Sequence, residues 1–152
     1  MSNNTEIIEE LVTGQYLFFK VLEIEYVIPV ERVREILTDQ NYTPIPNKPS
    51  CIRGVINLRG KIVPVVDVGT LFDEKERVAD SGCVVIVQHS EFEAEIGILV
   101  DSVQEVKEIQ ESVIENPTSS DKLPYVAGIA NLKNSAPILL DLDVLLDSKI
   151  RS

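Results

Sequence analysis

The sequence is poor in the residue types on which most metal sites and many enzyme sites depend. Its 152 residues include one histidine, two cysteines, one methionine and no tryptophan, and aromatic residues make up 5% of the chain. Cys51 and Cys83 lie far apart without a Cys-x-x-Cys pair, so with His89 they supply too few ligands for a zinc site. They are also too few for the disulfide scaffold of a small secreted domain. We therefore expect no metal, no cofactor and reduced thiols, as in a cytoplasmic protein.

Positive charge is scarce as well. The chain has 14 Lys and Arg residues against 25 Asp and Glu, a formal net charge of -11. Nucleic acids and anionic membrane surfaces need a basic face, so this charge argues against both as partners. No stretch approaches the roughly 20 consecutive apolar residues of a membrane span. Met1–Glu10 is polar and acidic, unlike a signal peptide. We expect a cytoplasmic protein without direct membrane insertion.

The sequence also lacks a convincing catalytic constellation. Asp67 and Asp141 occupy similar places in the two halves, as the aspartates of an aspartic protease do. That chemistry needs Asp-Thr/Ser-Gly turns, whereas these residues stand in Asp-Val-Gly and Asp-Leu-Asp. Capping of a helical turn by each aspartate is the simpler reading. His89 has no evident nucleophile beside it, and no glycine-rich phosphate loop precedes a helix. We expect no enzymatic activity.

What the chain does contain is a duplicated hairpin. Val55–Leu58 and Ile62–Val66 are rich in β-branched and apolar residues, and they flank an Arg59-Gly60 pair typical of a tight turn. The stretch Ile52–Asp67 recurs 74 positions later as Val126–Asp141. The matched residues are Gly54/Gly128, Asn57/Asn131, Leu58/Leu132, Asp67/Asp141, Leu71/Leu145 and Asp73/Asp147, with Arg59/Lys133 and Gly60/Asn134 similar.

The remaining elements follow the same duplication. Short β-rich runs predict strands at Gln15–Val21, Ile24–Pro29, Val33–Leu37, Cys83–Gln88 and Ile96–Val100, and 101–106 aligns with 31–36. Thr38–Pro49 carries three prolines and predicts a stiff loop, with a polar loop at Ile109–Leu123 as its counterpart. Short helical turns are expected at 5–12 and after Asp67. About five short strands per half favour small closed barrels, because closure removes exposed sheet edges.

The motif Gly-Val-x-Asn-x-Arg-Gly-x-Ile-x-Pro-x-x-Asp, preceded by Val-x-Glu-Ile and a proline loop, resembles the CheW family of bacterial chemotaxis adaptors. The resemblance spans about Gln15–Asp147. It implies an all-β fold of two SH3-like five-stranded β-barrels packed side by side, with short helical turns. We expect a flexible segment at 1–14, a first barrel at about 15–73, a linker at about 74–82, a second barrel at about 83–147 and a tail at 148–152.

The resemblance also implies function and partners. Such proteins have no catalytic activity and couple the cytoplasmic tips of methyl-accepting chemotaxis receptors to the regulatory domain of the histidine kinase CheA. They are cytoplasmic and are recruited to membrane-associated receptor arrays. Relatives with the same fold serve pilus motility and other chemosensory pathways, and the sequence does not distinguish these. An SH3-like peptide-binding module is the rival class, but the chain lacks the aromatic residues of a proline-binding groove.

By resemblance, the positions matching Val33, Gly54 and Arg59 affect receptor coupling, and the one matching Glu35 affects kinase coupling. Ile36 and Leu37 are adjacent on a strand, so they point to opposite faces and one of them is expected outside the core. A structural role competes with each assignment: Glu35 can pair with Arg59, and Gly54 and Asn57 can serve the turn. The receptor-binding candidates are Val33, Ile36, Leu37, Gly54, Asn57 and Arg59, and the kinase-binding candidates are Glu35, Ile45, Pro46 and Ile52.

Overall fold

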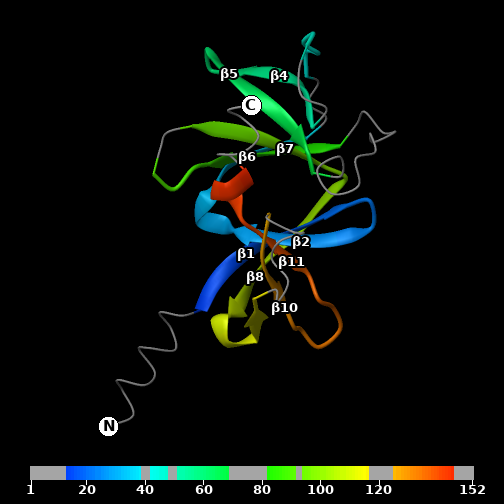
Figure 1. Ribbon diagram of the computed structural model, residues 1–152, viewed down its shortest axis with the longest axis vertical. Coiled ribbons are helices and arrows are strands. Elements are labelled where there is room, and N and C mark those ends of the chain that lie inside the picture. The colour runs from blue at the N-terminus through cyan, green and yellow to red at the C-terminus, as the bar shows by residue number, and fades with distance from the viewer. Residues whose placement is uncertain are drawn as a thin grey trace.

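The computed structural model describes residues 13–38, 42–47, 51–68, 82–91, 94–116 and 125–145, which fold almost entirely into strands (Figure 1). No described segment is a helix long and apolar enough to cross a membrane. In chain order the elements are β1 (Thr13–Val21), β2 (Ile24–Pro29), η1 (Val30–Arg32), β3 (Val33–Thr38), β4 (Ile52–Leu58), β5 (Lys61–Asp67), β6 (Cys83–Gln88), β7 (Glu95–Val100), β8 (Ser102–Gln110), η2 (Glu111–Val113), β9 (Ile114–Glu115), β10 (Val126–Ala130) and β11 (Ile138–Leu140).

The strands form two sheets, each built from both halves of the chain. One sheet has the order β3-β6-β7-β5-β4, and the other has the order β8-β1-β2-β11-β10-β9. The predicted division into a barrel at 15–73 and a barrel at 83–147 therefore does not describe the sheets, because the first hairpin of each half pairs with the later strands of the other half. The repeat makes the two hairpins alike in pattern, so the sequence alone does not choose between the two sets of partners.

Despite this exchange of hairpins, the two sheets have the same pattern of strand pairing. Each contains one parallel pair, β5 with β7 and β11 with β2, among otherwise antiparallel ladders. Gly54 is opposite Val65, and Gly128 is opposite Leu139, each just after a register shift. The prediction that the two glycines are equivalent is confirmed, and so is the all-β, SH3-like class. In the described residues neither sheet closes completely through its ladders, so the units are curved sheets rather than closed barrels.

The core has three clusters. β1 and β6 both contribute to the cluster between the sheets, β6 also contributes to the cluster inside its own sheet, and β1 also contributes to the cluster inside the other sheet. Val85 and Val87 of β6 pack in the cluster between the sheets, whereas Val84 and Ile86 pack inside their own curved sheet. In β1, Leu17 and Phe19 pack between the sheets and Phe18 packs inside the other sheet. Both faces of these strands are therefore buried, which is why their sequences are continuous apolar runs. Each such side chain contributes about 1.5–3 kcal/mol by leaving water.

The tight turns have the backbone that their hairpins require. Arg59 and Gly60 have φ values of 52° and 83°, and Leu22 and Glu23 have 50° and 69°. Positive φ at both central residues is the pattern whose twist matches that of the flanking strands. The Gly60 N–H donates to Asn57 Oδ1 (3.0 Å), and the Leu22 N–H donates to Asp101 Oδ2 (2.6 Å). The tight turn predicted at Arg59-Gly60 is confirmed.

One predicted loop is wrong. Ile109–Leu123 begins inside β8, which continues to Gln110 and is followed by η2 and β9. β8 is an edge strand, and most of its residues are exposed on both faces, so its sequence lacks the apolar alternation that marks a half-buried strand. The helical turns expected at 5–12 and 69–72 lie outside the described residues.

The exchanged hairpins predict that neither half folds alone. A fragment of residues 1–73 lacks β6 and β7, and so it lacks the strands that pair with β3 and β5. We expect this fragment to show no cooperative thermal transition by circular dichroism, and mixing it with a fragment of residues 82–152 to restore one. The whole chain is the control. A cooperative transition in the isolated fragment at any concentration tested would contradict the shared sheets.

Candidate partner-binding surfaces

The tip of the β4–β5 hairpin meets strand β3. Arg59 Nη2 lies 2.8 Å from Glu35 Oε1, with side-chain exposures of 75% and 29%. β3 and β4 are the outer strands of their sheet, so this ion pair spans the gap between the two edges of the curved sheet. Glu35 and Arg59, predicted from sequence as site residues and as a pair, are thus brought together. In so exposed a setting the pair contributes roughly 0–1 kcal/mol to stability. Since the Arg59 side chain is largely exposed, most N–H donors of its guanidinium group are accessible to a partner.

Strand β3 presents one apolar side chain outward. Ile36 is 40% exposed, whereas Leu37 packs against the cluster inside the sheet. The prediction that only one of them belongs to the core is confirmed. Val33, at the start of β3, is half-buried against the cluster between the sheets. Glu35 and Ile36 are adjacent on β3 and point to opposite faces, so Ile36 is exposed on the face that does not carry the Glu35–Arg59 pair.

Two candidate residues have structural roles. Asn57 is exposed, and its side chain accepts the Gly60 N–H that closes the hairpin turn. Gly54 is buried on β4, and a Cβ there would lie 2.4 Å from the Thr43 backbone oxygen. Its residue type is therefore required by a close approach of two backbones and not by turn geometry.

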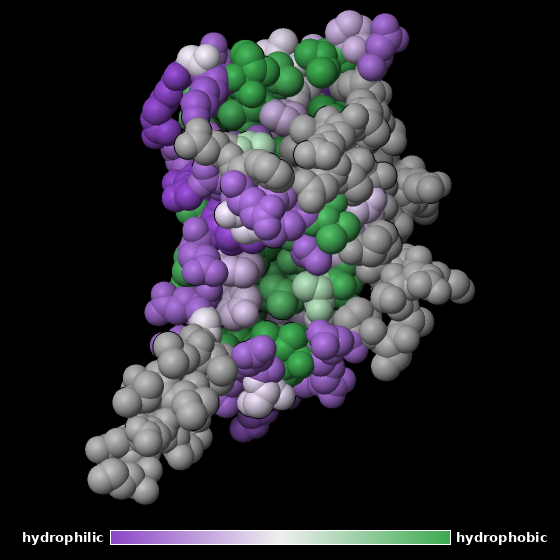
Figure 2. Space-filling view, turned by 60° about the vertical axis from the view of Figure 1, so that its left-hand side comes forward, coloured by the Kyte–Doolittle hydropathy of each residue, from purple (hydrophilic) through white to green (hydrophobic). Residues whose placement is uncertain are grey.

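The residues predicted to contact the kinase divide into two groups. Ile45 is 36% exposed, and Pro46 is also exposed, in the segment 42–47 beside β4. Ile52 is only 7% exposed and packs in the cluster between the sheets, so it does not belong to a contact surface. Ile52 lies before the register shift of β4 and packs between the sheets, whereas Ile56 of the same strand packs inside its own curved sheet. Figure 2 shows hydrophobic side chains gathered at the upper end of the molecule, where Figure 1 places β4 and β5.

The cluster of side chains around Arg53 of β4 was not predicted from the sequence. Arg53 contacts both Tyr42 and the fully buried Asp67, with Nη1 lying 3.4 Å from Asp67 Oδ2. The feature of the sequence that could have indicated this cluster is the basic Arg53 between Ile52 and Gly54, where the second half has Ala127. The predicted capping role is confirmed for Asp141, whose Oδ1 accepts the Val144 N–H at 3.1 Å. At Asp67 the described contact is the ion pair with Arg53.

A second polar cluster joins the two sheets. Asp143, in the helical turn 142–145 after β11, accepts hydrogen bonds from the Ser90 N–H (3.1 Å), the Ser90 hydroxyl (2.6 Å) and Arg32. Arg32 Nε also donates to the Gln88 backbone oxygen (2.8 Å), so η1, β6 and the C-terminal turn are tied together. The repeat gave no signal here, because the residue matching Asp143 in the first half is Gly69.

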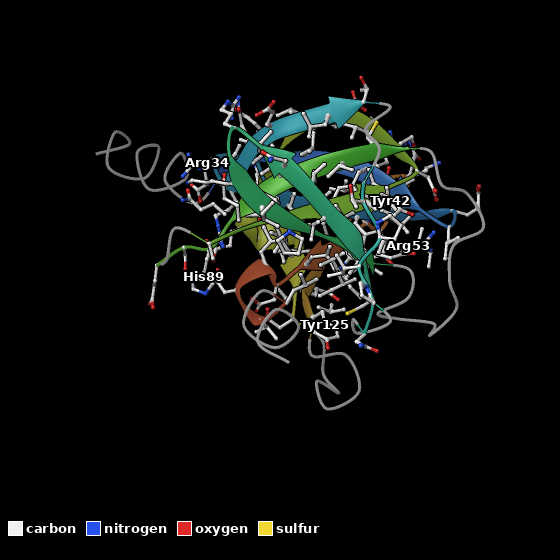
Figure 3. The ribbon with its side chains drawn as sticks, turned by 90° about the horizontal axis from the view of Figure 1, so that it is seen from above. Arg34, Tyr42, Arg53, His89 and Tyr125 are labelled. Atoms are coloured by element: carbon white, nitrogen blue, oxygen red, sulfur yellow. The ribbon has the colours of Figure 1, made fainter. Side chains whose placement is uncertain are left out.

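The cluster borders an open polar cleft of about 460 Å³ that contains His89. His89 is 8% exposed, its Nδ1 accepts the Glu91 N–H (3.0 Å), and its Nε2 lies 3.8 Å from Asp143. Ser90 donates to Asp143 and not to the imidazole, so these three residue types do not form the relay of a hydrolase. Figure 3 shows His89 and Arg34 on the side of the molecule opposite Tyr42 and Arg53. The cleft is lined by Glu31, Arg32, Arg34, Gln88, His89, Ser90 and Glu91.

Residues 15–149 match the family model of the CheW-like domain. The chain is 34% identical over 143 residues to the chemotaxis protein CheW of Klebsiella aerogenes, covering 92% of this chain and 86% of that protein. It is 33% identical over 79 residues to the protein PilI of Pseudomonas aeruginosa, covering 51% of this chain and 43% of that protein.

The fold gives the same result. The crystal structure of the scaffolding protein TtCheW from Thermoanaerobacter tengcongensis matches with a TM-score of 0.79 and 32% identity, covering 88% of this chain and 92% of that chain. The chain therefore belongs to the CheW family of chemotaxis scaffold proteins. The resemblance read from the motif around Gly54 and Arg59 is confirmed.

The Asp143 cluster predicts a pH-dependent contribution to stability. Burial alone would raise the pKa of Asp143, but the Ser90 hydrogen bonds and the Arg32 charge outweigh it and lower this pKa from 3.8 to about 2. Because the folded-state pKa is lowered, the carboxylate stabilises the fold above its unfolded pKa, and this contribution is lost as the pH falls toward 2.

We expect Asp143→Asn to lower the melting temperature at pH 7 by roughly 2–4 °C, the shift given by about 1 kcal/mol in a chain of this size. Solvent screening of the partly exposed side chain keeps the effect this small. Thermal melts of both proteins between pH 7 and pH 2 test it, and the difference should shrink toward the acid end. A difference that stays constant across this range would contradict the assignment.

Proposed function

We propose that the protein is a non-catalytic adaptor that couples methyl-accepting chemotaxis receptors to the regulatory domain of the histidine kinase CheA. The observation that carries this proposal is membership of the CheW family over nearly the whole chain. The absence of a hydrolase-like relay in the Ser90–His89–Asp143 cluster supports a binding role over a catalytic one. The protein acts in the cytoplasm and is recruited to receptor arrays by its partners.

The receptor site in this proposal lies on the outer side of β3 and the tip of the β4–β5 hairpin. Ile36 offers an exposed apolar contact on one face of β3, and Arg59 offers a rigid set of donors at the hairpin tip. A helical receptor tip can place apolar residues against Ile36 and a carboxylate or carbonyl against Arg59. Val33 and Leu37 are half-buried and Asn57 is engaged in the turn, so their contribution to this site is to shape it. Gly54 is buried and is a receptor candidate by the family resemblance alone.

The kinase site lies on the segment 42–47, with Ile45 and Pro46 as contacts. Both side chains are exposed, and the segment is joined to β4 by two backbone hydrogen bonds between Thr43 and Val55. An ordered segment loses less conformational entropy on binding than a free loop. Glu35 stays a kinase-coupling candidate from the family resemblance, and its ion pair places it beside the receptor site as well.

A direct test of the function measures binding of the purified protein to a receptor cytoplasmic fragment and to the kinase regulatory domain, each separately. The proposal predicts association with both. Association with neither would remove the adaptor reading. The alternative is an equivalent scaffold in a pilus-motility pathway, favoured only by the partial match to PilI. Receptor fragments from the two kinds of pathway, tested side by side, distinguish them.

Arg59→Ala tests the receptor site. The Arg59 side chain is 75% exposed and pairs with Glu35, so we expect the melting temperature to fall by no more than about 2 °C. Receptor binding is expected to weaken about tenfold, the loss of a charge-assisted contact, and Arg59→Lys to recover only part of it because a lysine cannot make a bidentate contact. Titration calorimetry with the receptor fragment measures both.

The control is Lys133→Ala, which removes the cation at the matching position of the other sheet, where Lys133 is also exposed. It should change receptor binding little. Equal losses of binding from the two alanine variants would show that the receptor site does not lie on the first hairpin.

Ile45→Asp tests the kinase site. Placing a charge on an exposed apolar contact should weaken binding to the kinase regulatory domain about tenfold, because the carboxylate must be desolvated on docking. The fold should tolerate the change, since the side chain is already 36% exposed. Val106→Asp is the matched control, as Val106 is 47% exposed on β8 of the other sheet. Kinase affinity within about twofold of wild type for Ile45→Asp at an unchanged melting temperature would place the kinase site elsewhere.

A further inference from the structure

The segment 42–47 is held against β4 at one point of its backbone. The Thr43 N–H donates to the Val55 oxygen (2.8 Å), and the Val55 N–H donates to the Thr43 oxygen (2.9 Å). In the other sheet the same place is taken by β9, where Glu115 is opposite Ile129 of β10. The segment is therefore the counterpart of β9, reduced among the described residues to one bridge.

Gly54 makes this bridge possible. A Cβ at position 54 would lie 2.4 Å from the Thr43 oxygen and 2.9 Å from Cδ2 of Tyr42, both closer than real Cβ contacts. The first of these atoms belongs to the backbone, so the segment itself would have to move. Any side chain at position 54 therefore acts on 42–47, while Gly54 itself is buried and offers no group to a partner.

A side-chain cluster holds the segment from the other side. Arg53 Nε donates to the Tyr42 hydroxyl (3.1 Å), and its guanidinium carbon lies 5.9 Å from the Tyr42 ring centre. The same guanidinium pairs with Asp67, which is fully buried at the end of β5. Figure 3 shows Tyr42 and Arg53 side by side. Because Asp67 is buried in the core, its ion pair holds Arg53 in place, and the hydrogen bond from Arg53 in turn holds Tyr42.

This cluster is confined to one sheet. The position matching Arg53 is Ala127, and Gly128 faces Ile114 and Glu115 of β9, with a built Cβ 2.7 Å and 3.0 Å from them. The β10 side thus has the glycine without the arginine. A difference between two otherwise repeated units points to a task that only one of them performs.

We propose that Tyr42, Arg53, Gly54 and Asp67 form a clamp that positions Ile45 and Pro46 for the kinase regulatory domain, so that Arg53 and Gly54 are positioning residues and not partner contacts. This inference rests on the proposed adaptor function. It moves Gly54 from the receptor site to the support of the kinase site, because the three atoms nearest to a Cβ at this position belong to Thr43 and Tyr42.

The test measures two properties of the full-length chain. Hydrogen exchange of the Thr43 and Val55 amides reports the clamp without any partner, and titration with the kinase regulatory domain and with the receptor fragment reports the two sites. For Gly54→Ala we expect exchange of these amides to rise about tenfold and kinase affinity to fall about tenfold, as for the loss of one or two hydrogen bonds. Receptor affinity should stay within about twofold.

Gly128→Ala is the matched control, since it introduces the same methyl group against β9 and should leave kinase affinity within about twofold. Arg53→Lys and Tyr42→Phe each remove the Arg53–Tyr42 hydrogen bond without crowding Gly54, so they serve if Gly54→Ala does not fold. Both should raise amide exchange and weaken kinase binding together, by about threefold or more.

Unchanged exchange of the Thr43 and Val55 amides in these variants would overturn the clamp. Faster exchange with unchanged kinase affinity, or with receptor affinity lost in its place, would overturn the link to the kinase. Failure of the wild-type chain to bind the kinase domain at all would instead count against the proposed function, while the exchange data would still judge the clamp.

Discussion

The apolar cluster between the two sheets holds both of them in place. β1 and β6 are each buried on both faces. One face of each strand packs inside its own curved sheet, and the other face packs against the opposite sheet. Each belongs to a hairpin that pairs with the later strands of the other half of the chain. The two sheets are therefore joined by covalent connections and by one apolar cluster, and we expect them to fold as a single unit.

This shared core determines where the partner surfaces can lie. Since β1 and β6 are buried on both sides, the proposed contacts among the described residues lie on outer strands, hairpin tips and bordering segments. The curvature of the β3-β6-β7-β5-β4 sheet brings its outer strands together, so that Glu35 on β3 meets Arg59 at the hairpin tip. The segment 42–47 lies on the outer edge of β4 in the same sheet. One sheet thus carries both proposed sites, and the other sheet holds it through the core and the Asp143 cluster.

The sequence predicted those features that local pattern determines. The strands around Val55 and Val85, the Arg59-Gly60 turn and the Asp141 cap follow from apolar runs, positive-φ residues and capping chemistry, and the family follows from the motif around them. The sheet partners could not be predicted, because both halves carry the same hairpin pattern. Arg53–Asp67 and Arg32–Asp143 also escaped prediction, since such ion pairs depend on the approach of distant strands. The burial of Ile52 could not be predicted either, because its neighbourhood in the chain does not reveal which residues of β4 face the other sheet.

The proposed adaptor function requires that one chain binds a receptor and a kinase at the same time through separate surfaces. The most direct measurement mixes the full-length protein with a receptor cytoplasmic fragment and the kinase regulatory domain, and determines the molar mass of the assembly by light scattering after size-exclusion chromatography. The account predicts a complex that contains all three components. Two binary complexes whose partners displace each other from the protein would contradict it.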